Sequence, residues 1–320
     1  MKCKFLINPM SGRGKLSHPQ ELDRLKEWFE SRSFSFDYVL SKSRADLIQK
    51  TQHALRDGYQ KIVAVGGDGT VNAVVNGFFE NGKPIRPDAE LAVAKMGTGS
   101  DYFKSIEKMC GGKVARATLN KSDWKECVIS GKSAPVDLVH CSYSPPKSRG
   151  EKKSVLMANI AGIGMSPEIV RKKEKNPSWL PHALGYALPT LTTIPKFRAQ
   201  PLIFDLDGEE HPVKLMAGFI SKGSFAGGGM KLGGQVSLDD GKLGILLIPK
   251  LSMLEAFARF RTLYSGGYAD VPGITYTTAQ KITVRSDSKK QFPAEIDGEY
   301  TLGTPFEFTV MPKAIRVCIV

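Results

Sequence analysis

Short apolar, strand-like runs alternate with helical patterns over the first 110 residues. The apolar runs cover residues 4–7, 36–40, 61–65 and 91–94. Apolar side chains recur at helical spacing from about residue 17, and a second helical pattern begins at Ser43, with Asp46 in the position of a capping box. Strands that alternate with helices predict a parallel sheet covered by helices, so we expect an α/β domain over residues 1–130.

The pattern changes after about residue 130 to a succession of strands. Strand-like runs cover residues 136–139, 155–160, 202–206, 213–220, 243–248, 282–284, 306–310 and 315–320. Helical spacing is confined to residues 251–263 and part of 165–195. We therefore expect a second, antiparallel, β-sandwich-like domain over residues 131–301.

The composition is that of an ordinary globular protein, with 320 residues, 41% of them hydrophobic and 24% charged. Such a chain buries a sizeable core without disulfide bonds. The five cysteines are scattered and have no zinc-site spacing, which indicates a reduced, cytoplasmic setting. The apolar run at the N-terminus is too short for a signal peptide, and no apolar stretch is long enough to span a bilayer. We expect any membrane contact to be peripheral.

The net charge of +13 is concentrated in one region. Residues 145–200 hold ten Lys and Arg against three acidic residues, a net charge of +7. Nucleic acid is disfavoured as a partner because no helix-turn-helix, zinc finger or RNP-like run accompanies the charge. The basic residues 171–175 precede Trp179 and an apolar stretch, a combination that suits docking on anionic lipid. A solvated helix face followed by core explains the same pattern equally well.

Residues 61–72 form the strongest chemical motif. A β-branched strand leads into the turn Gly-Gly-Asp-Gly-Thr at residues 66–70, and a helix begins near Thr70. Glycines let the backbone approach a ligand closely, and the helix N-terminus attracts phosphate. Asp68 is placed to hold a hydrated Mg²⁺ beside that phosphate. The alternative is a tight turn in which Asp68 only caps a helix.

Two further loops follow predicted strands in the same way. One holds residues 97–99 (Gly-Thr-Gly) and Asp101, and the other begins at Asn8. In an open parallel sheet, ligands bind outside the carboxyl ends of the strands. Three loops of small residues at one rim favour a phosphate site over simple turn chemistry.

These motifs resemble the ordered signatures of the diacylglycerol kinase catalytic family, which includes sphingosine, ceramide and bacterial lipid kinases. The similarity covers nearly the whole chain, because residues 159–164 and 225–230 are similar to the C-terminal motifs of the family. NAD kinases share Gly-Gly-Asp-Gly-Thr, whereas the loop at residues 97–101 favours the lipid branch. The matching segments are Asn8-Pro9-x-Ser11-Gly12-x-Gly14, Gly66-Gly67-Asp68-Gly69-Thr70, Gly97-Thr98-Gly99-x-Asp101 and Asp297-Gly298-Glu299.

The resemblance implies a role for each matching residue. Asp297 would accept the proton of the lipid hydroxyl, with Glu299 beside it, and Asp68 would complete the catalytic set. Asp68, Asp101 and Asp137 would hold the catalytic Mg²⁺ through waters, and Asp240 would hold a structural Mg²⁺ with nearby main-chain carbonyls. The ATP site would be lined by Asn8, Ser11, Gly66, Gly67, Asp68, Gly69, Thr70, Gly97, Thr98, Gly99 and Asp101.

Alternatives remain for two of these acids. Residues 207–209 repeat the tripeptide Asp-Gly-Glu, and Asp-Gly is a common hairpin turn. We choose Asp297 over Asp207 from the family match, and a hairpin remains the alternative for Asp240. Ala73 stands where the family usually has Glu, and Ser100 stands where it usually has Asn. Both departures leave nucleotide affinity and substrate class open.

The resemblance implies an N-terminal three-layer α/β nucleotide-binding domain and a C-terminal β-sandwich-like domain, with residues 302–320 packing back onto the first. The active site would lie in the interdomain cleft. We expect a cytoplasmic, peripherally membrane-associated lipid kinase of phospholipid biosynthesis that uses ATP and Mg²⁺. The alternatives are a kinase of a soluble acceptor, as in NAD kinases, and a catalytically silent relative that binds lipid or nucleotide. The oligomeric state is left open, with a homodimer as one option.

Overall fold

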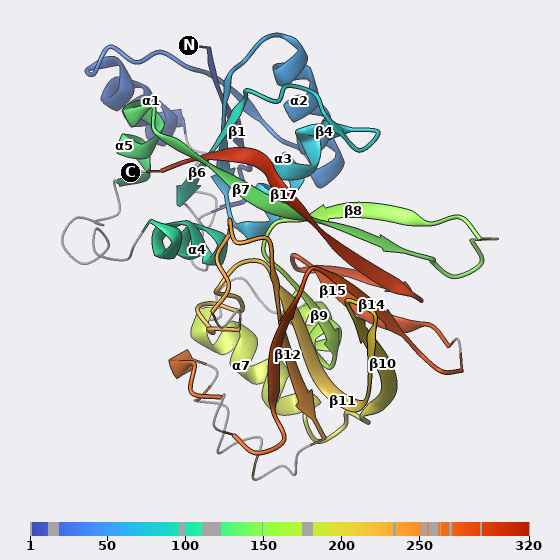
Figure 1. The fold of residues 1–320 in the computed structure, drawn as a ribbon. Coiled ribbons are helices and arrows are strands. Elements are labelled where there is room, and N and C mark those ends of the chain that lie inside the picture. Colours follow the sequence, from blue (N-terminus) through green and yellow to red (C-terminus); the bar gives the residue numbers. More distant parts are fainter. Residues whose placement is uncertain are drawn as a thin grey trace. The chain divides into compact units, whose positions relative to one another are not determined.

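The chain folds as two compact units, Met1–Val136 with Lys313–Val320 and Asp137–Pro312 (Figure 1). The chain passes between the units within β7 (Ser133–Tyr143) and β17 (Phe306–Cys318). Among the described residues, no helix is long and apolar enough to cross a membrane. The computed structural model describes residues 2–11, 19–95, 100–110, 123–148, 150–174, 182–232, 235–250, 255, 262, 264–268, 271–288 and 290–319.

The N-terminal unit is built on a parallel sheet with the order β17-β6-β3-β1-β2. The end of β17 joins this sheet beside β6, where Arg316 pairs with Glu90. Strands alternate with helices along the chain, as the hydrophobic pattern predicts. The elements are β1 (Cys3–Ile7), α1 (Pro19–Glu30), β2 (Asp37–Leu40), α2 (Arg44–Arg56), β3 (Lys61–Gly66), α3 (Asp68–Gly77), β4 (Phe79–Glu80), β5 (Lys83–Pro84), β6 (Glu90–Lys95), α4 (Asp101–Met109) and α5 (Asp123–Ser130).

The buried faces of this unit follow from side-chain spacing. Phe5 of β1 is fully buried and its ring contacts Phe29 of α1 at a centroid distance of 5.3 Å and Trp124 of α5 at 6.4 Å. Helix α2 begins where the capping pattern predicts, because Asp46 N donates to Ser43 Oγ at 3.1 Å. The sequence pattern therefore fixes both the strand faces and a helix start.

The second unit is an antiparallel, β-sandwich-like domain. Its strands follow the order β16-β15-β9-β11-β10-β14-β17, with β12 and β13 added beside β11, and β7 and β8 beside β17. The predicted α/β plus β fold is thereby confirmed. The elements are β8 (Lys153–Met157), β9 (Ile160–Gly164), α6 (Ser166–Glu174), α7 (His182–Thr193), β10 (Gln200–Leu206), β11 (Glu209–Ser221), β12 (Leu243–Pro249), β13 (Thr275–Ala279), β14 (Lys281–Arg285), β15 (Phe292–Ile296) and β16 (Glu299–Gly303).

Strand β11 separates two hydrophobic cores. Leu215 and Ile220 lie in the larger core, whereas Ala217 and Phe219 lie in the smaller core on the other face. The pairing register with β12 shifts between Leu215 and Ala217, which marks a bulge. Because one extra residue flips the side-chain alternation, Leu215 faces the same core as Ile220 despite their odd separation.

The structure departs from the predicted strands in several places. The run at residues 155–160 forms two strands, β8 and β9, because residues 158–160 turn their N–H groups toward Asp297. The two runs after residue 306 form one strand, β17. Strand β13 and the hairpin of β15 and β16 were not predicted as strands, since these short segments alternate weakly. Most of the helical pattern at 251–263 lies outside the described residues.

Candidate active site

The carboxyl ends of β1, β3 and β6 lie side by side at one edge of the parallel sheet. Ile7 pairs with Val65, and Gly66 pairs with Lys95. The loops that follow these strands therefore start at one rim, as the sequence predicts. Gly12 and Gly14 of the first loop, and Gly97, Thr98 and Gly99 of the third, lie outside the described residues.

Gly66 is required by the close approach of Thr70. A Cβ atom on Gly66 would lie 2.2 Å from Thr70 Oγ1, so any other residue would push the start of α3 away from β3. Asn8 links the first loop to this turn, because its Nδ2 donates to Thr70 Oγ1 at 3.2 Å and its backbone N donates to Val65 O at 3.0 Å. Two of the three predicted loops are thus joined by hydrogen bonds.

Helix α3 begins at Asp68 with Gly67 as its N-cap, and no side chain caps it. A Cβ atom added to Gly67 or Gly69 would meet no described atom within 4 Å. The helix N-terminus, which carries a partial positive charge, is therefore not covered by described atoms at these two glycines.

Asp68 caps a helix, but the helix is α4 and not its own α3. Its carboxylate accepts hydrogen bonds from Asp101 N at 3.2 Å and Tyr102 N at 3.0 Å. Burial raises the pKa of Asp68, and the charge of Asp101 adds to the rise, while the hydrogen bond from Tyr102 opposes it. Ser100, at the N-cap position of α4, adopts a left-handed φ of 44° and makes no side-chain cap. Asp68 thus ties the turn after β3 to the segment after β6.

Asp101 is buried, with 4% of its surface exposed, and lies 2.8 Å from Lys104 Nζ in an ion pair. Ala73 lies buried within α3. In the neighbouring position of that helix, Asn72 Oδ1 accepts hydrogen bonds from the Arg44 guanidinium and, at 3.2 Å, from Asn76 Nδ2. Three polar side chains therefore meet beside the position where the usual acidic residue is replaced by Ala73.

In the second unit, Asp297 lies in the two-residue turn between β15 and β16. Asp297 and Gly298 have φ angles of 49° and 87°, and Ile296 pairs with Glu299. Two successive positive φ angles define the twisted hairpin turn in which Asp-Gly is favoured. Glu299, the other predicted catalytic acid on this hairpin, is exposed.

The Asp297 carboxylate holds the segment between β8 and β9. Ala158 N donates to Oδ2 at 2.7 Å, and Asn159 N and Ile160 N donate to Oδ1 at 3.0 and 2.8 Å. Only 8% of the residue is exposed. The geometry therefore shows a carboxylate that is fixed in position by three N–H donors and that supports a loop in return.

Glu295 is a second acid on the same hairpin, which the sequence analysis did not single out as a site. Burial raises its pKa to about 7, and the charge of Asp297 adds to the rise, while a hydrogen bond from Gly298 N opposes it. Its carboxyl accepts hydrogen bonds from Gly298 N at 2.8 Å and Ser166 Oγ at 3.2 Å. An acid with a pKa near neutrality suits proton transfer. The only sequence signal was its place two residues before Asp297.

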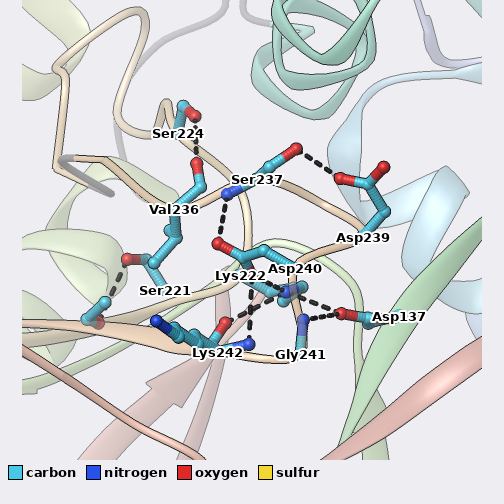
Figure 2. A network of polar contacts seen from close by, with 11 residues as sticks. Asp137, Ser221, Lys222, Ser224, Val236, Ser237, Asp239, Asp240, Gly241 and Lys242 are labelled. Carbon is cyan, nitrogen blue, oxygen red and sulfur yellow. Dashed lines mark hydrogen bonds and ion pairs between the residues drawn. The ribbon is translucent and has the colours of Figure 1, made fainter.

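Asp137 and Asp240 meet at one point of the second unit, where Lys222 lies between them. Lys222 Nζ is 2.8 Å from Asp137 Oδ2 and 2.7 Å from Asp240 Oδ1, and it donates to Lys242 O at 3.0 Å (Figure 2). The predicted structural Mg²⁺ needs the Asp240 carboxylate and nearby main-chain carbonyls, and the ammonium already lies against Asp240 Oδ1 and Lys242 O. The residues at Asp240 therefore do not fit a resident metal ion. Among the described residues, no group of three or more His, Cys, Asp and Glu side chains is arranged to hold one.

The fold and the glycine-rich rim define a class of two-domain kinases, and comparison with known proteins agrees. Residues 2–141 match the diacylglycerol kinase catalytic domain, and residues 160–319 match the YegS C-terminal NAD kinase beta sandwich-like domain. The chain belongs to the diacylglycerol kinase family built from these two domains. Kinases of this family use ATP as the phosphate donor.

Relatives that align along nearly their whole length are named diacylglycerol kinase. The chain is 25% identical over 317 residues to a diacylglycerol kinase of Bacillus subtilis, and the aligned region covers 99% of this chain and 95% of that protein. It is 25% identical over 323 residues to a diacylglycerol kinase of Staphylococcus aureus, with coverage of 99% and 91%. Two Bacillus anthracis structures share the fold, with TM-scores of 0.74 and 0.69, identities of 20% and 18%, and coverage of 100% of this chain and 97% of each of those chains.

Proposed function

We propose that the protein transfers the γ-phosphoryl group of MgATP to the hydroxyl group of a membrane lipid of the diacylglycerol type. The observation that carries the proposal is the turn of residues 66–70, where glycine leaves the N-terminus of α3 open beside Asp68. Phosphoryl transfer depends on positioning and on charge neutralisation, which backbone N–H groups and the Mg²⁺ of MgATP would supply, with carboxylates orienting the waters of the metal. The full-length similarity to proteins named diacylglycerol kinase supports a lipid acceptor.

In this proposal the first unit binds the nucleotide. Asn8, Ser11 and the turn of residues 66–70 surround the phosphates, and the loop of residues 97–99 contributes to the same site. Asp68 and Asp101 accept hydrogen bonds from waters of the Mg²⁺ that accompanies ATP. This Mg²⁺ arrives with the nucleotide as part of the substrate.

The second unit supplies the proton acceptor. Asp297 is the proposed base, because its three backbone N–H donors fix the position of its carboxylate. Glu299 follows it on the hairpin and assists. Arg171, which is exposed on α6, supports peripheral binding to anionic lipid.

Labelled ATP tests the proposal directly. The protein is incubated with Mg²⁺ and γ-labelled ATP, either with mixed micelles that contain diacylglycerol or with NAD, and the organic and aqueous phases are counted. We expect label in the organic phase. Label confined to an aqueous NAD product would establish the soluble-acceptor alternative, which the name of the C-terminal domain makes worth testing. ATP binding without transfer to any lipid extract would establish a silent relative.

A further inference from the structure

Lys222 is a buried cation at the end of β11. Its side chain is fully buried and extends between the carboxylates of Asp137 and Asp240. An ammonium group has three protons, and three oxygen acceptors lie at hydrogen-bond distance: one from each carboxylate, and Lys242 O at 3.0 Å. Every donor of the ammonium is thereby matched within the cluster.

The turn of residues 237–242 is wrapped around this ammonium. Asp240 Oδ2 accepts a hydrogen bond from Ser237 N at 2.9 Å, and its Oδ1 accepts one from Lys242 N at 3.0 Å. Asp137 Oδ2 accepts one from Gly241 N at 2.7 Å, which brings β7 to the same turn (Figure 2). Burial opposes ionisation of Asp240, but hydrogen bonds from Lys222, Ser237 and Lys242 outweigh it and hold its pKa below its ordinary value. Both carboxylates are therefore positioned by the backbone and share one counter-charge, the Lys222 ammonium.

The same oxygens are what a divalent ion would use. Two carboxylates and a main-chain carbonyl form a typical partial ligand set for Mg²⁺ or Ca²⁺, with waters filling the remaining positions. A metal ion would have to approach these oxygens to about 2.0–2.6 Å, well inside the space taken by Nζ. Two cations would also repel each other strongly in a buried position. Lysine and metal are thus mutually exclusive here.

We infer that the Lys222 ammonium replaces a structural divalent metal ion at the turn of residues 237–242, so that the fold of the second unit is independent of metal. A substitution that removes the ammonium and leaves its space empty should convert the same oxygens into a divalent-cation site. This inference concerns the second unit's own stability and does not depend on which acceptor the enzyme phosphorylates. Any requirement for Mg²⁺ in turnover would then belong to the nucleotide alone.

Thermal unfolding of the full chain without nucleotide tests the first half of the inference. We expect the same Tm for the wild-type protein in EDTA, Mg²⁺ or Ca²⁺, and no stoichiometric metal in elemental analysis after dialysis. A fall in Tm on adding EDTA, together with one bound ion per chain that is lost in Asp240→Asn, would overturn the inference. This measurement needs no variant at Lys222 and stands even if such variants do not fold.

Substitutions at Lys222 test the second half. In EDTA, Lys222→Ala and Lys222→Met both leave two carboxylates without their counter-charge, and we expect Tm to fall by about 5–15 °C. Mg²⁺, Ca²⁺ or Mn²⁺ should raise the Tm of Lys222→Ala by about 3–10 °C, because the ion fills the vacated space. Lys222→Met fills that space with an apolar chain and should gain much less.

A second buried lysine provides the matched control. Lys61 of the first unit is fully buried, but its Nζ has one carboxylate nearby, Glu90 at 3.4 Å, and donates to Val128 O at 2.8 Å. Lys61→Ala should be destabilised without recovery in divalent ions. Equal responses of Lys61→Ala and Lys222→Ala to the metals would refute a specific cation position at Lys222.

Discussion

Asp207 and Asp297 occupy the same place in two hairpins of the same construction. Each has a left-handed φ, of 52° and 49°, and is followed by glycine. Each donates its N–H to the carbonyl of a neighbouring strand, Lys281 O or Ile160 O. The carboxylate of each accepts hydrogen bonds from backbone N–H groups in return, Asp207 from residues 280–281 and Asp297 from residues 158–160. The two differ in burial, since Asp207 is exposed and Asp297 is buried.

This pair provides an internal comparison for the proposed base. We expect Asp297→Asn to lower kcat by at least about 100-fold, because the proton of the acceptor hydroxyl loses its base. Asp207→Asn should leave kcat near the wild-type value. Because each substitution weakens charge-assisted hydrogen bonds, both should also reduce the free energy of unfolding, by about 1–3 kcal/mol. Steady-state kinetics with lipid micelles and thermal unfolding, measured side by side, separate the two effects. Similar losses of kcat in both variants would assign Asp297 a supporting role only.

Glu295 predicts a dependence of stability on pH. Its pKa is about 7 in the folded protein against an ordinary value of 4.5, so the folded state holds a proton that the unfolded state releases. The contribution of Glu295 to the free energy of unfolding should therefore be fully present below pH 4.5. It should fall by about 3 kcal/mol as the pH rises through 7. Glu295→Gln should remove this contribution between pH 5 and about 8, while Glu299→Gln at an exposed position should not. The comparison is made by chemical denaturation at each pH. Parallel stability curves for Glu295→Gln and the wild type would contradict the assignment.

Replacement of Gly69 and of Gly66 should have different effects on ATP binding and thermal stability. Gly69→Ala meets no described atom and lies within a helix, so we expect an unchanged or higher Tm. Its Cβ would enter the space assigned to phosphate, so the Kd for ATP should rise by about tenfold or more, which corresponds to a loss of roughly 1.4 kcal/mol of binding free energy. Gly66→Ala collides with Thr70 and should lower Tm as well. Calorimetric titration with ATP and thermal unfolding check both variants. Normal ATP affinity in Gly69→Ala would place the phosphates elsewhere.

Arg171 tests the proposed membrane contact. It is exposed on α6, and its guanidinium lies over the ring of Tyr300 at 5.7 Å. Arg171→Glu should reduce binding to vesicles containing anionic lipid by several-fold, since each basic residue near such a surface contributes about 1 kcal/mol. Arg24→Glu, with the same change of charge in the other unit, is the control. Vesicle sedimentation at low and high salt measures the effect. Equal binding of all three proteins would direct the search to another surface.

The first unit could largely be predicted from the sequence because its signals are local. Residues 4–7, 61–65 and 91–94 form strands as expected, and Ser43 marks the start of α2. The position of the glycine turn at residues 66–70 follows from the strand before it. What the sequence did not reveal is that Asp68 caps α4, because that contact joins residues more than thirty positions apart.

The second unit could be predicted less well because its decisive contacts are non-local. The break at residues 158–159 depends on Asp297, which lies far along the chain. Lys222 follows a strand and reads as an ordinary surface lysine, whereas its counter-charges come from β7 and from a later turn. A charged side chain can be buried only where partners compensate its charge, and the local sequence does not show which distant residues those partners are.

Asn159 is a residue that contacts both the backbone beside the ammonium cluster and the acidic hairpin. Its carbonyl accepts the N–H groups of Lys222 and Gly223, while its own N–H donates to Asp297. A shift of the backbone at position 222 is therefore transmitted across one residue to the proposed proton acceptor, Asp297. Slow turnover after substitution of this lysine would consequently report a displaced hairpin, and would be no evidence that the amine itself takes part in the reaction.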